Sequence, residues 1–342
     1  MVLNGQLKIK IMRNILILIS LSLLILTSCG GGKKDGDMKN GQEAEIIKLE
    51  KPQFDADSAF YFVEKQVEFG TRVPGTNPHK LCGDWLISTM EQFADELVVQ
   101  SFTARLYNNE MKNGRNIISI FNPDARSRIL LGAHWDTRPY ADHDPNPENH
   151  NKPIDGANDG ASGVGVLMEV ARQLSIKQPE IGVDIIFFDL EDWGEPQSTQ
   201  SDKEDTWCLG SQHWSKNLHK PAYNARFGIL LDMVGAPNAK FAKEGTSTYY
   251  APDIVNKVWD IAAQLGFSEN FISTYAPSIV DDHMYVNKYA QIPMIDIIQY
   301  EPSSRTYFNH NWHTMEDNMD GIDKFTLQKV GQVVLAVIYN EK

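Results

Sequence analysis

The stretch VDIIFFDLEDWGEP, residues 183 to 196, decides the fold. Its first half is a nearly continuous apolar run, which is typical of a short strand that is buried on both faces. The run then ends in acidic residues, among them Glu191 and Asp192, with Trp193 directly beside them. An apolar strand gains no stability from ending in acids, so we expect these side chains to belong to a functional site.

Similar apolar runs recur along the chain, and segments with the apolar spacing of helices lie between them. We expect strands at residues 97–107, 114–121, 128–136, 183–190, 225–235 and 293–300. We expect helices at residues 57–69, 77–93, 157–174, 252–265 and 325–339. Continuous apolar strands that alternate with helices indicate an α/β fold, in which helices cover both faces of a mixed, mostly parallel central sheet.

In open sheets of this kind, ligands bind outside the carboxyl ends of the strands. Polar residues at the predicted strand ends and in the loops beside them are His134, Asp136, Asp155, Asp159, Glu191, Asp192, Asp232, Asp281, Asp282, His283 and His313. Histidine and carboxylate side chains without cysteine suit a zinc ion with nitrogen and oxygen ligands and one open coordination position. We therefore expect a metal site at this edge of the sheet.

The overall composition narrows the class of ligand. The chain has 342 residues, of which 42% are hydrophobic, so it can bury one large core. Its 32 basic and 45 acidic residues give a formal net charge of -13. A strongly acidic protein is poorly suited to the phosphate backbone of nucleic acid, which we exclude as a partner.

The first 28 residues form a predicted signal peptide. A basic segment precedes the apolar run 15–26, which is too short to span a membrane comfortably, and LTSC follows at residues 26–29. This resembles a bacterial lipoprotein signal, which implies a lipid anchor on Cys29 and a place in the periplasm or outer membrane. An ordinary signal peptide with an incidental cysteine is the alternative. Residues 29–50 are Gly-rich and charged, as in a flexible tether, and residues 51–342 form the expected catalytic domain.

Two further cysteines, Cys82 and Cys208, lie in the expected domain. They could form a disulfide, because an exported protein meets an oxidising compartment. They could equally be two buried free thiols, since spacing in the sequence does not show whether their Cα atoms lie close enough.

Longer motifs surround the polar strand ends and occur in a fixed order. They are RVPGT (72–76), AHWDT (133–137), GANDGASGVGVLMEVAR (156–172), FFDLEDWG (187–194), CLGSQHW (208–214), LLDMVG (230–235), DDH (281–283) and WHTMEDN (312–318). With these motifs the chain resembles the zinc aminopeptidase superfamily over nearly all of residues 55 to 340, and within it the animal-type glutaminyl cyclases. AHWDT and NDGASG are typical of the superfamily, whereas DDH and a Trp directly before the last metal-type His are typical of the cyclases.

The resemblance implies that Asp159, Asp192 and His313 bind one catalytic zinc ion per chain. It places Glu191 at the general acid/base position. It places Asp281 at the carboxylate that assists proton movement at the leaving group.

The resemblance also gives roles to neighbouring side chains. In two-metal aminopeptidases the residues that match His134 and Asp232 bind a second zinc, whereas the cyclases keep them around a single zinc. Asp136 is expected to orient the imidazole of His134 from outside the ligand set. Trp193 and Trp312 are expected to line a water-poor substrate pocket.

Two positions depart from the family pattern. Asp192 is one methylene shorter than the usual Glu, so the backbone must bring it closer to the metal. Asp296 occupies a position where the animal enzymes have a His, which leaves one polar contact of their site in doubt. His283 is either a surface group or a site residue.

The implied activity is that of a glutaminyl-peptide cyclotransferase, which converts the N-terminal Gln of peptides and proteins into pyroglutamate and releases ammonia. The alternative is an aminopeptidase with one or two zinc ions, in which Glu191 activates water. A binding lipoprotein that has lost catalysis is a third reading, but Glu191, Asp192 and His313 are all present. We expect a monomer.

Overall fold

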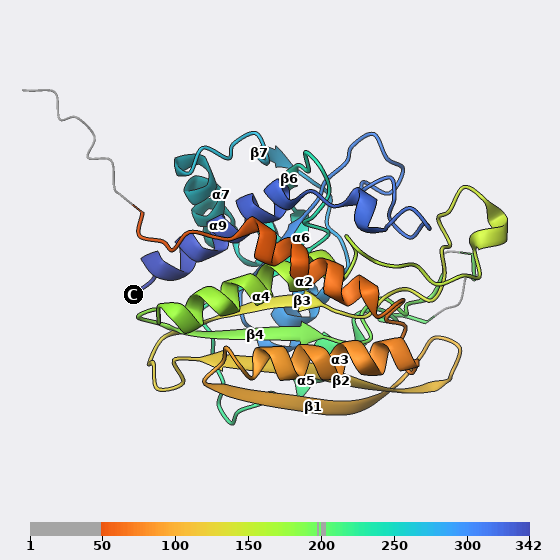
Figure 1. Ribbon diagram of the computed structural model, residues 1–342, viewed down its shortest axis with the longest axis horizontal. Helices are drawn as coiled ribbons and strands as arrows, with labels where there is room; N and C mark the ends of the chain where they lie inside the picture. The colour runs from red at the N-terminus through yellow and green to blue at the C-terminus, as the bar shows by residue number, and fades with distance from the viewer. Residues whose placement is uncertain (1–48, 197, 200–202) are drawn as a thin grey trace, which may run out of the picture. The chain divides into compact units, whose positions relative to one another are not determined.

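A computed structural model describes residues 49–196, 198–199 and 203–342 (Figure 1). The predicted signal peptide, Cys29 and nearly all of the predicted tether lie outside these residues. Leu49–Lys342 is one structural unit. Within the described part of the chain, no helix has both the length and the apolar character needed to cross a membrane.

The main sheet has six strands in the order β1-β2-β4-β3-β5-β8. The strands are β1 (Glu96–Arg105), β2 (Met111–Phe121), β3 (Arg128–His134), β4 (Gly182–Phe188), β5 (Gly228–Asp232) and β8 (Met294–Ile298). β2 is antiparallel to both β1 and β4, whereas β4, β3, β5 and β8 are parallel to one another. The predicted fold class is confirmed. A separate parallel pair joins β6 (Phe241–Lys243) and β7 (Phe271–Tyr275).

Both faces of the sheet are buried, which explains the continuous apolar runs. Along β4, Val183, Ile185 and Phe187 pack into one core, whereas Ile186 and Phe188 pack into a second core on the opposite face. Side chains of a strand alternate between its two faces, so each face needs its own apolar set. The same alternation holds along β2, β3, β5 and β8.

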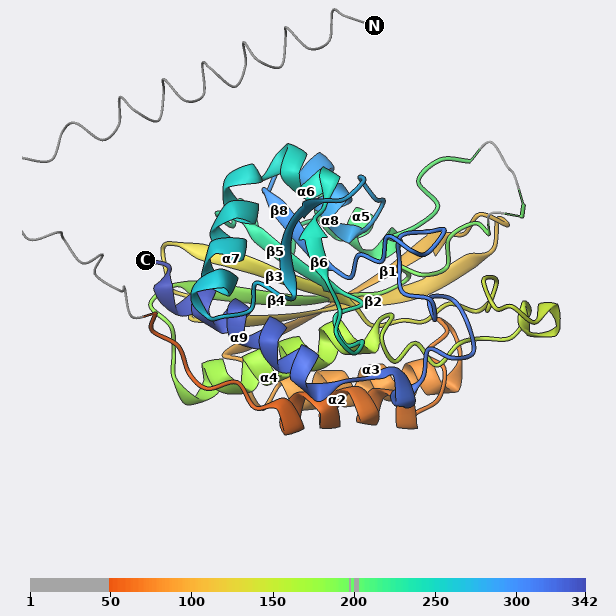
Figure 2. The ribbon, with the colours of Figure 1, turned by 90° about the horizontal axis from the view of Figure 1, so that it is seen from above.

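Helices cover the two faces unequally. The larger core is covered by α2 (Ala56–Glu68), α3 (Asn77–Met90), α4 (Ala161–Ile176), α7 (Pro252–Gln264) and α9 (Lys324–Asn340). The shorter helices α5 (Leu209–Lys216), α6 (Gly245–Tyr250) and α8 (Asp282–Tyr285) lie on the side opposite α2, α3 and α4 (Figure 2). Single turns occur at Pro147–Asn149, Val286–Ala290 and Met319–Gly321. Cys82 and Cys208 are both buried and free, so the disulfide considered from the sequence does not form.

The start of α4 differs from the prediction in a way that matters for the site. The helix was expected from residue 157 but begins at Ala161, because residues 157–160 form a turn that carries Asp159. Gly160 ends this turn with φ +98°, and a Cβ there would lie 2.7 Å from the backbone oxygen of Asp136. Only glycine allows both this conformation and this close approach.

Candidate metal centre and active site

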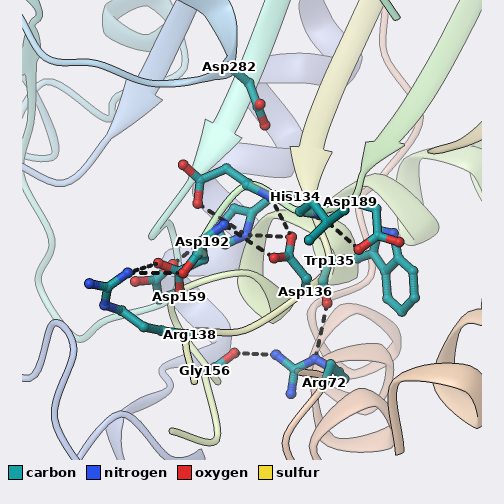
Figure 3. A network of polar contacts seen from close by, with 12 residues as sticks. Arg72, His134, Trp135, Asp136, Arg138, Gly156, Asp159, Asp189, Asp192 and Asp282 are labelled. Carbon is teal, nitrogen blue, oxygen red and sulfur yellow. Dashed lines mark hydrogen bonds and ion pairs between the residues drawn. The ribbon is translucent and has the colours of Figure 1, made fainter. Parts of the chain in front are cut away.

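The polar residues predicted for the strand ends meet at one edge of the sheet. His134 is the last residue of β3 and Asp232 the last of β5, while Glu191 and Asp192 lie in the turn after β4. These strands are parallel, so their carboxyl ends lie at the same edge. Asp159 reaches this edge from the turn before α4 (Figure 3).

Asp159, Asp192 and His313 form the first buried cluster, with potential ligand atoms within 4.8 Å of one another. Nε2 of His313 lies 3.1 Å from Oδ1 of Asp192 and 3.6 Å from Oδ2 of Asp159. Oδ2 of Asp192 is buried without a hydrogen-bond partner among the described residues. One imidazole nitrogen and two carboxylates form a donor set that fits zinc. The unpaired buried oxygen is a further sign that an ion belongs here.

A second cluster shares Asp159 with the first. Nε2 of His134 lies 3.0 Å from Oδ1 of Asp159 and 3.2 Å from Oδ1 of Asp232. Asp159 therefore directs one carboxylate oxygen toward each histidine, which is the arrangement of a bridging carboxylate. Ligand atoms for a second metal ion are therefore present, in addition to those for the first.

Burial disfavours the ionisation of these carboxylates. It raises the pKa of Asp192 to about 6, where the charge of Asp159 adds to the rise, and it raises the pKa of Asp232 to about 7. Burial acts in the same direction on Asp159, but the hydrogen bond with His134 and the positive charges of His134, His313 and Arg138 together outweigh it and lower the pKa of Asp159. Crowded buried carboxylates repel one another, and a divalent cation would relieve that repulsion.

Asp142 holds the imidazole of His313 from behind, and it was not predicted from the sequence. Nδ1 of His313 lies 3.2 Å from Oδ1 of Asp142. Arg138 donates from Nε and Nη2 to the two Asp142 oxygens, at 2.8 and 2.7 Å. Burial opposes ionisation of Asp142, but the contacts with Arg138 and His313 hold its pKa far below the usual range. A metal-binding histidine needs such an outer partner to fix its ring.

Asp136 fixes the backbone of the acid pair. Its carboxylate accepts hydrogen bonds from the amides of Glu191 and Asp192, at 3.0 and 3.2 Å (Figure 3). Its Oδ1 lies 3.8 Å from Nδ1 of His134, which is longer than a hydrogen bond. The contact that we expected with this imidazole is therefore electrostatic, whereas the hydrogen bonds of Asp136 hold the turn after β4.

The turn that carries Asp159 is held from two sides. Asp317, of the WHTMEDN motif, accepts hydrogen bonds from the backbone amides of residues 158 and 159 at 2.7 and 3.0 Å. The buried guanidinium of Arg72 donates to the backbone oxygens of Trp135 and Gly156 (Figure 3) and to that of Asp155. Residues of two motifs, RVPGT and WHTMEDN, therefore position Asp159 through its own backbone and that of its neighbours.

Glu191 is buried beside the first cluster, and one of its two carboxylate oxygens points away from that cluster. Oε1 contacts the thiol of Cys208 at 3.2 Å, and Oε2 lies 3.8 Å from Nδ1 of His134. Burial raises the pKa of Glu191 well above its usual range, and the charges of Asp192 and Asp281 add to the rise. A carboxyl whose pKa is raised toward neutrality is suited to carry protons.

Asp281 approaches the cavity from the start of α8, and Oδ2 of Asp281 is buried without a hydrogen-bond partner among the described residues. Burial raises its pKa and that of Asp296, with which it interacts. Ligand atoms of the two carboxyls lie within 4.8 Å of each other, so the charge of one disfavours ionisation of the other. His283 is fully buried with Nε2 3.1 Å from Oε2 of Glu244, so it is not a surface group.

A cavity of about 450 Å³ opens above both clusters. Its acidic lining consists of Asp159, Glu191, Asp192, Glu195, Asp232 and Asp281, with His313 beside them. Its other lining residues are mostly apolar or aromatic: Trp207, Met233, Pro277, Ser278, Ile279, Val280, Ile298, Thr306, Tyr307, Phe308 and Trp312. No Lys or Arg is found among these described lining residues, so the cavity suits a cationic group beside an apolar one.

Of the two tryptophans predicted for this cavity, one lines it and the other does not. Trp312 lines it, but Trp193 packs instead with a separate apolar cluster that contains Phe102, and Lys112 lies 4.5 Å above its ring. Trp207 provides the wall that was assigned to Trp193. A Cβ at Gly194 would lie 1.9 Å from the Trp207 ring, so glycine at that position makes room for it. In the sequence, Trp207 directly follows the acidic run SDKEDT, residues 201–206, and this was the available signal.

Comparison with known proteins gives the family. Residues 116–338 match the family described as Peptidase family M28. The chain belongs to peptidase family M28. The matched span contains every residue of the two clusters, together with Glu191 and Asp281.

Two curated relatives of this M28 chain carry different activities. It is 24% identical to the glutaminyl-peptide cyclotransferase of Drosophila melanogaster, over 77% of this chain and 75% of that protein. It is 27% identical to the aminopeptidase YwaD of Bacillus subtilis, over 67% of this chain and 45% of that protein.

Solved structures of bacterial proteins are more similar. The glutaminyl cyclase of Bacteroides thetaiotaomicron, solved with N-acetylhistamine, is 52% identical with a TM-score of 0.84, over 86% of this chain and 100% of that chain. A Zn-dependent exopeptidase from Parabacteroides distasonis is 51% identical with a TM-score of 0.84, over 85% of this chain and 100% of that one. A structure described as a leucine aminopeptidase precursor from Bacteroides thetaiotaomicron is 52% identical, with a TM-score of 0.83, over 86% of this chain and 100% of that chain. The chain is thus an enzyme of a zinc-dependent family.

Proposed function

We propose that the chain is a zinc-dependent glutaminyl-peptide cyclotransferase, which converts the N-terminal Gln of peptides and proteins into pyroglutamate and releases ammonia. The observation that carries this proposal is the content of one cavity. The cavity combines the proton carrier Glu191, the second acid Asp281 and an apolar wall that contains Trp207 and Trp312. The similarity to a bacterial glutaminyl cyclase at 52% identity supports the same reaction.

The reaction demands little beyond positioning and one proton transfer. The α-amine of the N-terminal Gln attacks the γ-carbonyl carbon of the same residue, a five-membered lactam closes, and the γ-amide nitrogen leaves as ammonia. Because nucleophile and electrophile belong to one residue, holding the folded conformer removes most of the entropic barrier.

Each polar residue of the cavity has a place in this reaction. Asp159, Asp192 and His313 would hold zinc, which polarises the γ-carbonyl as a Lewis acid when bound. Glu191 takes a proton from the attacking amine and delivers one to the departing nitrogen, a task that its raised pKa suits. Asp281 accepts a hydrogen bond from that nitrogen and keeps it in place.

The charge of the cavity supports a substrate that enters by its amino terminus. Its acidic lining and its lack of described Lys or Arg side chains favour an ammonium group over a carboxylate. The apolar wall limits water beside the reacting carbonyl. Because lactam closure consumes no water, this wall favours cyclisation over hydrolysis.

A second candidate is an aminopeptidase that removes N-terminal residues. The specific observation in its favour is the short distance, 3.0 and 3.2 Å, from Nε2 of His134 to Asp159 and Asp232, which supplies donors for a second ion. In this reading Glu191 takes a proton from a water molecule that attacks the first peptide bond.

A paired-substrate assay tests the proposal. The zinc-loaded protein is incubated with a Gln-initiated peptide and with a Leu-initiated amide, and mass spectrometry and ammonia release are followed. We expect the first peptide to lose one ammonia and the second to stay intact. An N-acetylated copy of the Gln peptide, whose amine cannot attack, is the substrate control. Cleavage of the Leu amide with no change in the Gln peptide would refute the cyclase assignment.

Glu191→Gln tests the proton carrier in the same assay. It keeps the shape of the side chain but removes proton transfer, so we expect kcat to fall by roughly 100-fold or more. Glu195→Gln is the matched control, because it neutralises another acid of the same cavity wall. We expect this control to change KM more than kcat. Full activity of the Glu191 variant would remove the assignment.

A further inference from the structure

Cys208 places a buried thiol against the carboxylate of Glu191. Sγ of Cys208 lies 3.2 Å from Oε1 of Glu191, and Cys208 is fully buried. A thiol is a hydrogen-bond donor, although a weak one, and a carboxylate oxygen accepts. Burial raises the pKa of Cys208 well above its usual range, so the sulfur keeps its proton at neutral pH. The thiol is therefore a donor here, not a nucleophile.

The backbone fixes the distance between these two side chains. The amide of Cys208 donates to the backbone oxygen of Glu191 at 3.0 Å, and the amide of Leu209 donates to that of Leu190 at 2.9 Å. Leu190 and Cys208 both have left-handed backbones, with φ of +56° and +58°. Non-glycine residues rarely adopt this conformation, so the surrounding contacts must hold both turns in place.

The first turn of α5, which directly follows Cys208, packs closely against the end of β4. A Cβ at Gly210 would lie 2.1 Å from the backbone oxygen of Asp189, so α5 lies directly against the end of β4. The side-chain amide of Asn116 bridges the two, since it accepts from the amide of Asp189 and donates to the backbone oxygen of Gly210. Cys208 therefore reaches Glu191 from a rigid support.

The two oxygens of Glu191 then have different surroundings. Oε1 faces the thiol, whereas Oε2 lies 3.8 Å from Nδ1 of His134, on the side of the metal clusters. A carboxylate without a partner on one oxygen would rotate and present either oxygen to the reacting groups. We propose that Cys208 is a positioning residue for Glu191, whose Oε1 it holds so that Oε2 carries the transferred proton. This inference rests on the proposed role of Glu191, which both lactam closure and hydrolysis require.

Two matched substitutions at Cys208 test the inference, with Cys82 as the internal control. Cys208→Ala removes the donor, whereas Cys208→Ser keeps one, and both leave the same backbone strain. We expect kcat of the Ala variant to fall about tenfold with KM within about twofold, and kcat of the Ser variant to stay within about threefold of the parent. Cys82 is buried in the larger core, so Cys82→Ala and Cys82→Ser are expected to alter Tm without separating their kcat values.

An infrared measurement gives a readout that does not depend on activity. The S–H stretching band of Cys208 is assigned from the difference between parent and Cys208→Ser spectra. In the Glu191→Gln protein, we expect this band to move to higher frequency, because a neutral amide oxygen is a weaker acceptor than a carboxylate. The band of Cys82 is expected to stay where it is.

The outcomes separate this inference from the proposed function. Equal kcat values for Cys208→Ala and the parent, or a Cys208 band that Glu191→Gln leaves unmoved, would overturn the positioning role while cyclisation stands. If the protein hydrolyses the Leu amide instead of cyclising Gln, the cyclase assignment fails. The ratio of kcat between the Ala and Ser variants, measured on the hydrolysed substrate, then still decides the role of Cys208.

Discussion

Replacing Asp142 should weaken zinc binding, although Asp142 is not one of the proposed ligands. It lies 3.2 Å from Nδ1 of His313, and Arg138 pairs with both of its oxygens, so it is an ionised and rigid acceptor. The two atoms make an ion-pair contact, and Nδ1 of His313 has no hydrogen bond of full geometry among the described residues. We expect zinc binding to turn this contact into a hydrogen bond to a charged group, which contributes about 1.5–3 kcal/mol. The Asp142 side chain is only 16% exposed, so water would replace little of that contribution after its removal.

These values convert into affinities. Asp142→Ala should cost about 2 kcal/mol of zinc binding, which is about a 30-fold increase in Kd. Asp142→Asn keeps one carbonyl acceptor but loses the charge, so we expect a loss of about 1 kcal/mol, or about fivefold. Both variants also leave the buried Arg138 without its partner carboxylate, so Tm should fall in both.

Competition with a chromophoric chelator measures Kd for zinc directly, at a single fixed pH. The control is Asp84→Asn, since Asp84 pairs with Lys80 and Arg115 at the surface and should leave Kd unchanged. A Kd for Asp142→Ala within about twofold of the parent would refute the argument that an outer carboxylate of this kind is worth at least tenfold in affinity. A fall in Tm without a change in Kd would show that Asp142 only stabilises Arg138.

Removal of the metal should lower Tm. Zinc at a concentration about 100-fold above its Kd should raise the free energy of unfolding by about 2.7 kcal/mol, as followed by calorimetry. A Tm that does not change with zinc would contradict the metal site. Trp207→Ala should raise KM for a Gln peptide about tenfold, because Trp207 lines the cavity. Trp193→Ala should lower Tm with little change in KM, because Trp193 packs in a separate apolar cluster. The reverse pattern in steady-state kinetics would show that Trp193 lines the pocket instead. Gly210→Ala should destabilise the fold by about 3 kcal/mol or more, because its Cβ would lie 2.1 Å from the Asp189 backbone oxygen; an unchanged urea midpoint would disprove the close packing. Burial lowers the pKa of His219 to about 4, whereas its value in the unfolded chain is about 6.5. Between these pH values the unfolded chain binds one more proton than the folded protein. The free energy of unfolding should therefore fall by up to about 3 kcal/mol as the pH drops from 6.5 to 4. Denaturant unfolding of His219→Gln should show a flatter pH dependence in that window, and an identical slope would count against this origin.

The apolar runs predicted most of the fold because burial on two faces leaves a strong pattern in the sequence. β4 and β5 carry apolar residues at odd and even positions, which only a sheet covered on both sides requires. Short elements such as β6, β7, α6 and α8 were not predicted, because a segment of three to six residues carries too little periodicity. The turn before α4 was read as helix, since its apolar spacing continued through residues that tertiary contacts bend.

Site residues that belong to a recognisable motif could be predicted from the sequence. Site residues that a loop brings back to the site from elsewhere in the chain could not. Asp159, Asp192 and His313 come together as the motifs implied. Asp142 pairs with a histidine far away in the sequence, and no local pattern links them. Trp193 was preferred over Trp207 because it adjoins the acid pair in sequence, but the two side chains lie in different clusters.

The proposed ligands are distributed very unevenly along the chain. Asp159 and Asp192 lie near its middle, whereas His313 follows β8 and precedes the turn Met319–Gly321 and α9. A chain still under synthesis, or cut short before residue 313, can offer the ion two carboxylates but no imidazole from this cluster. We therefore expect the proposed zinc site to be completed only after residue 313 has been synthesised.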